Sequence, residues 1–107
     1  MNISSAFQTF LTEAPEHAAA WMETVKQLDQ ASALDGKTEE RAYIAVLAAL
    51  RMTGGIPFHV ASAHGHGASR EEIISAVLLG LPAAGNGVIQ SLPIALEAFA
   101  QADGKSA

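Results

Sequence analysis

Residues 34–72 read LDGKTEERAYIAVLAALRMTGGIPFHVASAHGHGASREE, and this stretch decides the fold. Within it, residues 43–50 (YIAVLAAL) carry no polar side-chain atom except the hydroxyl of Tyr43. A helix built from such residues is apolar on every side and needs packing partners all round. We therefore expect a central helix that is capped at its start by Asp35 and runs to about Met52, where Thr-Gly-Gly stops it.

Apolar residues at helical spacing continue on both sides of this helix. Before it, the pattern predicts a short helix capped by Ser4 or Ser5, and a second helix that starts at Pro15 and runs to about residue 30. After it, Pro57 suits the first turn of a fourth helix that ends near residue 67.

The clearest local signal is Ser-Arg-Glu-Glu, starting at Ser69, before the apolar run IISAVLLGL. In such a capping box the serine hydroxyl and the last glutamate each bind a backbone N–H that the helix leaves unpaired. A fifth helix should therefore start at Ser69 and break near Pro82. A last helix should follow from about Asn86 and be bent by Pro93. The expected fold class is all-α, with about six helices.

Length and composition restrict the partners of this chain. Its 107 residues are enough for one domain, half of them are hydrophobic, and the mean hydropathy is positive. A small domain of this composition exposes apolar surface unless copies associate, so we expect a homo-oligomer. The net charge of -5, with six scattered basic residues, argues against nucleic acid and anionic membranes as partners.

Several other classes are disfavoured by what the sequence lacks. No run of about 18 apolar residues is present, so no membrane span is expected. The first residues do not place a basic segment before an apolar core, so we expect no secretory signal and a cytoplasmic location. The sequence has no cysteine, which removes disulfides, thiolate metal ligands and thiol nucleophiles.

Two ionisable residues lie on apolar helix faces and are candidates for chemistry. Glu40 shares a face with Ile44 and Leu47, where burial would raise its pKa and prepare it for proton transfer. The alternative for Glu40 is an ion pair or a first-turn helix-dipole contact. His59 follows Phe58 in an apolar run, where the alternative to catalysis is a hydrogen-bonded core histidine.

Three histidines, His59, His64 and His66, lie close together in the sequence. The i, i+4 spacing that places two imidazoles at one metal ion does not occur among them, and His64 and His66 point about 160 degrees apart on a helix. We therefore expect no metal site, and no residue pattern points to another cofactor.

The segments that carry a family resemblance are LDGKTEE at residues 34–40, the apolar central helix, His59, GAS with EEI at 67–73, and AGN at 84–86. Together they resemble the carboxymuconolactone decarboxylase family, which includes the AhpD-like alkylhydroperoxidases, over about residues 34–99. AhpD-like members carry a Glu, a CxxC whose first cysteine follows twelve residues later, and a His four residues after the second cysteine. Counting from Glu40 places Met52 and Gly55 at the cysteine positions and His59 at the histidine.

The resemblance implies a single AhpD-like domain over residues 1–107, with a central helical hairpin, that assembles as a trimer or a hexamer. Glu40 and His59 are then the catalytic candidates for proton transfer, and Met52, Gly55 and Phe58 are expected to bind substrate. The decarboxylase branch also lacks the cysteine pair and is the better analogue, although its members usually have a Glu where this chain has a glycine at 55. Thiol peroxidase activity is not expected.

Two functions therefore fit the sequence. The first is a decarboxylase or lyase that uses Glu40 and His59 on a small carboxylate or lactone. The second is a non-catalytic binding or structural oligomer. We expect Glu40 and His59 to pair in one pocket, but a straight hairpin turning near Gly54 would leave them roughly 13 Å apart along the axis. A steep crossing, an early helix end or a neighbouring subunit must then bring them together.

Overall fold

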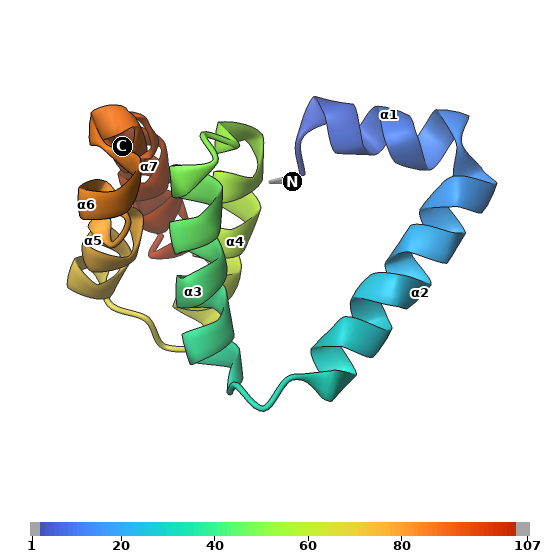
Figure 1. Cartoon of the computed structure of the whole chain (residues 1–107), viewed down its shortest axis with the longest axis horizontal. Helices are drawn as coiled ribbons and strands as arrows, with labels where there is room; N and C mark the ends of the chain where they lie inside the picture. Colours follow the sequence, from blue (N-terminus) through green and yellow to red (C-terminus); the bar gives the residue numbers. More distant parts are fainter. Residues whose placement is uncertain (1–2, 105–107) are drawn as a thin grey trace.

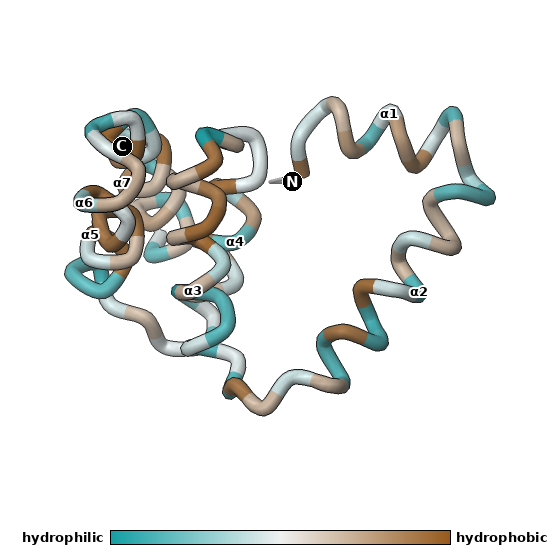
Figure 2. The backbone as a smooth tube through the Cα atoms, in the orientation of Figure 1, coloured by the Kyte–Doolittle hydropathy of each residue, from teal (hydrophilic) through white to brown (hydrophobic). Residues whose placement is uncertain are grey.

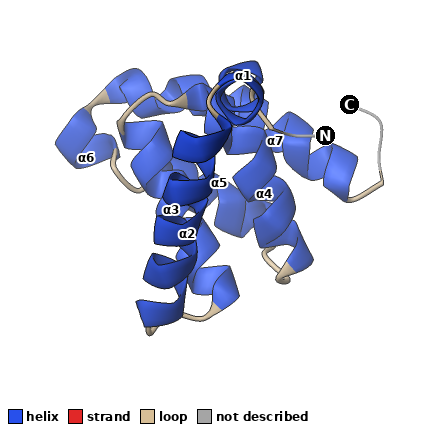
Figure 3. Cartoon of the chain, turned by 90° about the vertical axis from the view of Figure 1, so that its right-hand side faces the viewer, coloured by secondary structure: helices blue, strands red, loops and turns tan. Residues whose placement is uncertain are grey.

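The computed structural model describes residues 3–104, and every regular element in that range is helical (Figure 1; Figure 3). This confirms the all-α fold class. The elements in chain order are α1 (Ser5–Glu13), α2 (Pro15–Ala31), α3 (Gly36–Ala49), the 3-10 turn η1 (Thr53–Gly55), α4 (Ile56–Gly65), α5 (Arg70–Leu78), the four-residue α6 (Leu81–Ala84), the 3-10 turn η2 (Asn86–Gln90) and α7 (Ser91–Ala102).

Side chains cap α1 and α3 at the predicted positions. The Ser4 hydroxyl accepts the Phe7 N–H at 3.2 Å, and Asp35 accepts the Thr38 N–H at 2.8 Å. Each cap satisfies one of the backbone donors that a helix start leaves unpaired. Pro15 occupies the first position of α2, as predicted, where a missing N–H costs nothing.

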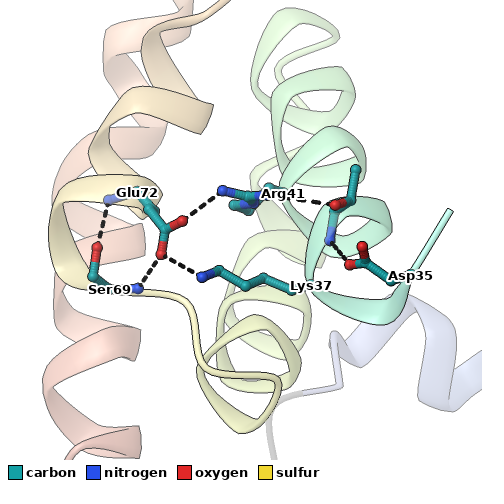
Figure 4. Close-up of polar contacts among 6 residues, drawn as sticks. Asp35, Lys37, Arg41, Ser69 and Glu72 are labelled. Carbon is teal, nitrogen blue, oxygen red and sulfur yellow. Dashed lines mark hydrogen bonds and ion pairs between the residues drawn. The ribbon is translucent and has the colours of Figure 1, made fainter.

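The predicted capping box at the start of α5 is present. Ser69 Oγ accepts the Glu72 N–H at 3.1 Å, and Glu72 Oε1 accepts the Ser69 N–H at 2.8 Å. The same carboxylate pairs with Lys37 and Arg41 of α3, so it joins the start of α5 to the central helix (Figure 4). The hydrogen bond from the Ser69 backbone, followed by the bond from Lys37, holds the pKa of Glu72 below its ordinary value.

The central helix ends earlier than predicted, at Ala49 rather than at about Met52. Arg51 takes a left-handed conformation, with φ 59°, and its N–H donates to the Ala48 carbonyl while the Met52 N–H donates to that of Leu47. These two bonds form a Schellman motif, which satisfies the last carbonyls of a helix. The prediction missed it because this position is usually glycine, whereas here the glycines lie later, in η1.

The C-terminal half differs from the predictions at its prolines. The break after α5 comes at Leu78, before Pro82, which lies in the first turn of α6. The helix predicted from Asn86 begins as the 3-10 turn η2, and α7 starts at Ser91. Pro93 is the third residue of α7 and removes none of its internal bonds, because the first four N–H groups of a helix have no intrahelical acceptor. The predicted bend therefore has no cause here.

Helices α3, α4, α5 and α7 pack around one hydrophobic core. The central helix contributes Ile44, Leu47 and Ala48 to it, but Tyr43 and Val46 are about half exposed. The expectation that this helix is buried all round is therefore wrong for a single chain, because α1 and α2 do not cover its outer side (Figure 1). The largest fully buried apolar side chains are Ile44, Ile56, Val60, Ile73, Val77 and Val88.

Helices α1 and α2, here called the arm, stand apart from α3–α7, here called the body (Figure 1). The arm helices contact mainly each other. Within them Ala18 alone is buried. In the part of the chain that the structure describes, no helix has the length and apolarity needed to cross a bilayer.

Candidate functional site

Glu40 and His59 form the predicted pair, and they do so within one chain, which the sequence left open. Glu40 Oε1 lies 2.7 Å from His59 Nδ1, and their side chains are 19% and 25% exposed. The early end of α3 helps, because Glu40 then lies nine residues before its helix end and His59 three residues after the start of α4. At 1.5 Å per residue the offset falls to about 9 Å, and the hydrogen bond shows that the two side chains cover the remainder.

A third residue, Ser62, completes the network and was not predicted. Its hydroxyl donates to Glu40 Oε2 at 2.7 Å, so each carboxylate oxygen of Glu40 accepts one short hydrogen bond. Ser62 lies one helical turn after His59 on α4, and residues three apart share a helix face. That spacing is the signal that could have identified it.

The electrostatics of Glu40 differ from the prediction. Burial alone raises the pKa of Glu40, but hydrogen bonds from His59 and Ser62, and the charges of His59 and His66, together outweigh it. The pKa of Glu40 therefore lies below its ordinary value, and the expectation of a raised pKa is wrong in its net direction. Glu40 is ionised at neutral pH and can only accept hydrogen bonds, so His59 Nδ1 carries the hydrogen and Nε2 is left for a substrate.

Two aromatic rings flank the imidazole of His59. The Tyr43 ring centroid lies 4.4 Å from it, and the Phe58 ring stands edge-on at 5.1 Å. Tyr43 is 47% exposed and Phe58 46%, so the imidazole lies among apolar groups on the outer side of the molecule. Phe58 therefore lies at the site, as expected for a residue that binds substrate.

The other two expected substrate-binding residues, Met52 and Gly55, have their described contacts elsewhere. Met52 is 55% exposed and follows the Schellman turn. A Cβ on Gly55 would lie 3.2 Å from a methyl group of Leu47, so position 55 faces the core side of α3. Among residues 3–104, no hydrogen bond joins Met52 or Gly55 to Glu40 or His59.

A pocket of about 400 Å³ adjoins Glu40. Its carboxylates make it acidic, so it disfavours an anionic ligand. His66 closes one wall: its ring lies against Gly36, and its Nδ1 is 2.9 Å from the Ser62 carbonyl. The lining residues are Asp29, Leu34, Gly36, Glu39, Glu40 and His66.

The three neighbouring histidines contact different partners. His59 pairs with Glu40, His66 packs on Gly36, and His64 Nε2 lies 3.0 Å from Asp103 with its ring edge-on to a phenylalanine of α7. Among residues 3–104, no three His, Asp or Glu side chains are grouped closely enough to hold a metal ion.

Comparisons with known proteins give the family of this chain. The model of the carboxymuconolactone decarboxylase family matches residues 15–98, which include all three members of the network. Comparison with curated proteins gives no match. Among solved structures, the chain is similar to the apo form of a carboxymuconolactone decarboxylase family protein from Legionella pneumophila, with 27% identity and a TM-score of 0.75 over 91% of this chain and 87% of that one. This chain belongs to the carboxymuconolactone decarboxylase family.

Proposed function

We propose that this protein is a lyase of the decarboxylase type, acting on a small carboxylate or lactone, in which His59 transfers the proton and Glu40 holds His59 in place. The observation that carries the proposal is the network of Glu40, His59 and Ser62, with two hydrogen bonds of 2.7 Å to one carboxylate. A carboxylate bound to one imidazole nitrogen fixes the tautomer and stabilises the imidazolium, which leaves the other nitrogen as acid or base.

The proposed reaction needs a single proton-transfer group. A substrate carboxylate leaves as CO₂, and the electron pair of the broken C–C bond moves into a conjugated carbonyl of the same substrate. The resulting enolate carbon then takes a proton from Nε2 of protonated His59, and His59 recovers that proton from water. The carboxylate of Glu40 stays hydrogen-bonded to Nδ1 through the cycle and keeps Nε2 directed at the substrate.

The surroundings of the network favour one approach for the substrate. Asp29, Glu39 and Glu40 make the neighbouring pocket negative, so a substrate carboxylate is disfavoured there. The side of His59 between Tyr43 and Phe58 carries no charge of its own and fits the flat, conjugated ring of an unsaturated lactone. We infer that the reacting carbon approaches Nε2 from that side.

Turnover in D₂O tests the proposal. The protein is incubated with small carboxylated lactones, carboxymuconolactone among them, and NMR follows loss of the substrate and deuterium at the product carbon. The parent should release CO₂ and incorporate one deuterium. His59→Gln should abolish turnover, and Glu40→Gln should reduce it by roughly 10²- to 10⁴-fold, the usual contribution of a positioned acid or base. Glu71→Gln, at an exposed carboxylate on α5, is the matched control.

A thermal-shift screen of the same compounds separates binding from catalysis, because a ligand of the folded state raises the melting temperature. Compounds that stabilise the parent without turning over would favour the non-catalytic alternative, a binding oligomer. If no carboxylate or lactone either stabilises the protein or is turned over, the proposed function is overturned.

A further inference from the structure

The isolated chain exposes more surface than its size predicts. Its accessible surface is 6731 Å², whereas a folded monomer of 11.1 kDa is expected to expose about 5,650 Å². Its radius of gyration is 14.1 Å, against about 13 Å expected for this length. The excess, about 1,100 Å² per chain, exceeds the roughly 800 Å² that each partner buries in a standard protein interface.

Much of the exposed apolar surface lies on two faces. The arm face, on α2, consists of Trp21, Met22, Val25 and Leu28, at the spacing of one helix face and 39–65% exposed. The body face consists of Tyr43, Val46 and Leu50 on α3, with Met52 and Phe58 beyond it, and is 46–63% exposed. Figure 2 shows the two apolar regions on segments that stand apart within one chain.

We propose that the arm face of one copy docks on the body face of a second copy. The chain supplies both halves of the contact, but the arm helices contact mainly each other, and the two apolar regions stand apart within one chain (Figure 1). Exchange between copies buries both faces of every chain, whether two copies exchange arms or several close a ring. A helix of 17 residues is about 25 Å long, which suits a groove contact of this size.

Charge on the two surfaces fits the same docking. The arm helices carry four carboxylates and one lysine, and one of the carboxylates, Asp29, lies one turn after Val25 at the edge of the arm face. Arg51 adjoins Leu50 at the edge of the body face, is exposed, and forms no ion pair with any residue that the structure describes. An apolar centre with charges of opposite sign at its rim is the usual anatomy of a specific interface.

Docking would also close the candidate site. Tyr43 and Phe58 belong to the body face and flank His59, so a docked arm would form an outer wall over the side from which the proposed substrate approaches. The exclusion of water would strengthen the interaction between His59 and Glu40. This consequence for catalysis rests on the proposed function, whereas the docking itself does not.

Trp21 makes the docking measurable, because it is the chain's only tryptophan and lies on the arm face. Sedimentation velocity gives the mass of the full chain at about 20 µM, and Trp21 emission and its quenching by iodide give the exposure of the arm face. Val25→Glu places a charge on the arm face and Val46→Glu on the body face. Gln30→Glu, on the opposite side of α2, is the control.

The parent should sediment as an oligomer with a blue-shifted, protected Trp21. Val25→Glu and Val46→Glu should each weaken association by roughly 100-fold or more, since an unpaired charge in an apolar contact is costly. Val46→Glu should also expose Trp21, because the arm face of one copy is then released from the body face of another. Gln30→Glu should leave mass and emission unchanged, and circular dichroism should show all variants helical.

Three results would overturn the inference. A monomeric parent with exposed Trp21 removes the interface. A monomeric parent with protected Trp21 shows that the arm closes on its own body. If only one of the two charged variants weakens association, the contact joins two arm faces or two body faces and not one of each. None of these outcomes bears on lactone turnover, so the docking and the proposed function can fail separately.

Discussion

Removing the hydroxyl of Ser62 tests whether the network around Glu40 stabilises the fold. In Ser62→Ala, Glu40 loses one of its two 2.7 Å hydrogen bonds. A hydrogen bond to a charged group contributes about 1.5–3 kcal/mol. The Glu40 side chain is 19% exposed, so water replaces part of this bond. We therefore expect the free energy of unfolding to fall by about 1.5–2 kcal/mol at pH 7. That corresponds to a fall in melting temperature of roughly 6–12 °C.

The effect of Ser62→Ala should depend on pH in a defined direction. The folded-state pKa of Glu40 lies below its ordinary value. The ionised carboxylate therefore stabilises the fold at pH values above the unfolded-state pKa, and this stabilisation is lost as the pH falls through the folded-state pKa. Once Glu40 is protonated, only a neutral hydrogen bond remains to be lost, worth about 0.5–1.5 kcal/mol. The difference between parent and variant should therefore shrink on acidification.

Urea denaturation at pH 7 and near pH 3, at one protein concentration, measures both effects. Ser75→Ala is the matched control, because Ser75 is exposed within α5 and has no side-chain hydrogen bond among the described residues. It should change stability by less than about 0.5 kcal/mol. A Ser62→Ala loss no larger than that of the control, or one equal at both pH values, would refute the reasoning about Glu40.

Three further predictions follow from other parts of the molecule. Ser69→Ala should cost about 1 kcal/mol in the free energy of unfolding, because it removes half of the capping box; a change within error would contradict this. Ser91→Ala should be neutral or stabilising by up to about 1 kcal/mol, because the buried Ser91 hydroxyl has no hydrogen-bond partner in the described range; a clear loss in urea denaturation would disprove it. The parent should not reduce alkyl hydroperoxides with a dithiol, since it has no cysteine, whereas the double variant Met52→Cys and Gly55→Cys should gain that activity; turnover by the metal-free parent would contradict the first half.

The sequence predicted best where the structure depends on local chemistry. The caps at Asp35 and Ser69, and the helix start at Pro15, each need only a few neighbouring residues, and all three are confirmed. The end of α3 was missed because the residue in the left-handed position is Arg51, which has no intrinsic preference for that conformation. Tertiary packing, with the Arg51 guanidinium over Gly87, accompanies the turn, and the sequence pattern does not show such a contact.

The candidate site was predicted as a pair and found as a network. Family spacing was enough to select Glu40 and His59, but the direction of the Glu40 pKa depended on a competition between burial and hydrogen bonds. The sequence indicated the burial, because Glu40 precedes Ile44 and Leu47 on one face. Ser62 shares a face of α4 with His59, but the sequence does not set the rotation of α4 against α3, so it did not show that the Ser62 hydroxyl reaches Glu40. The sign of the shift therefore followed from the geometry alone.

The central helix explains why the site and the exposed surface lie together. Residues 40, 44 and 47 form the face that turns toward the chain's own core, and residues 43, 46 and 50 form the adjoining face, which the chain leaves uncovered. An apolar run such as YIAVLAAL satisfies both faces, so its composition does not tell which one a partner covers. His59 contacts Glu40 on the first face and Tyr43 on the second. The imidazole thus lies at the boundary between the protected core and the surface left for association, and its solvent exposure depends on what covers Tyr43.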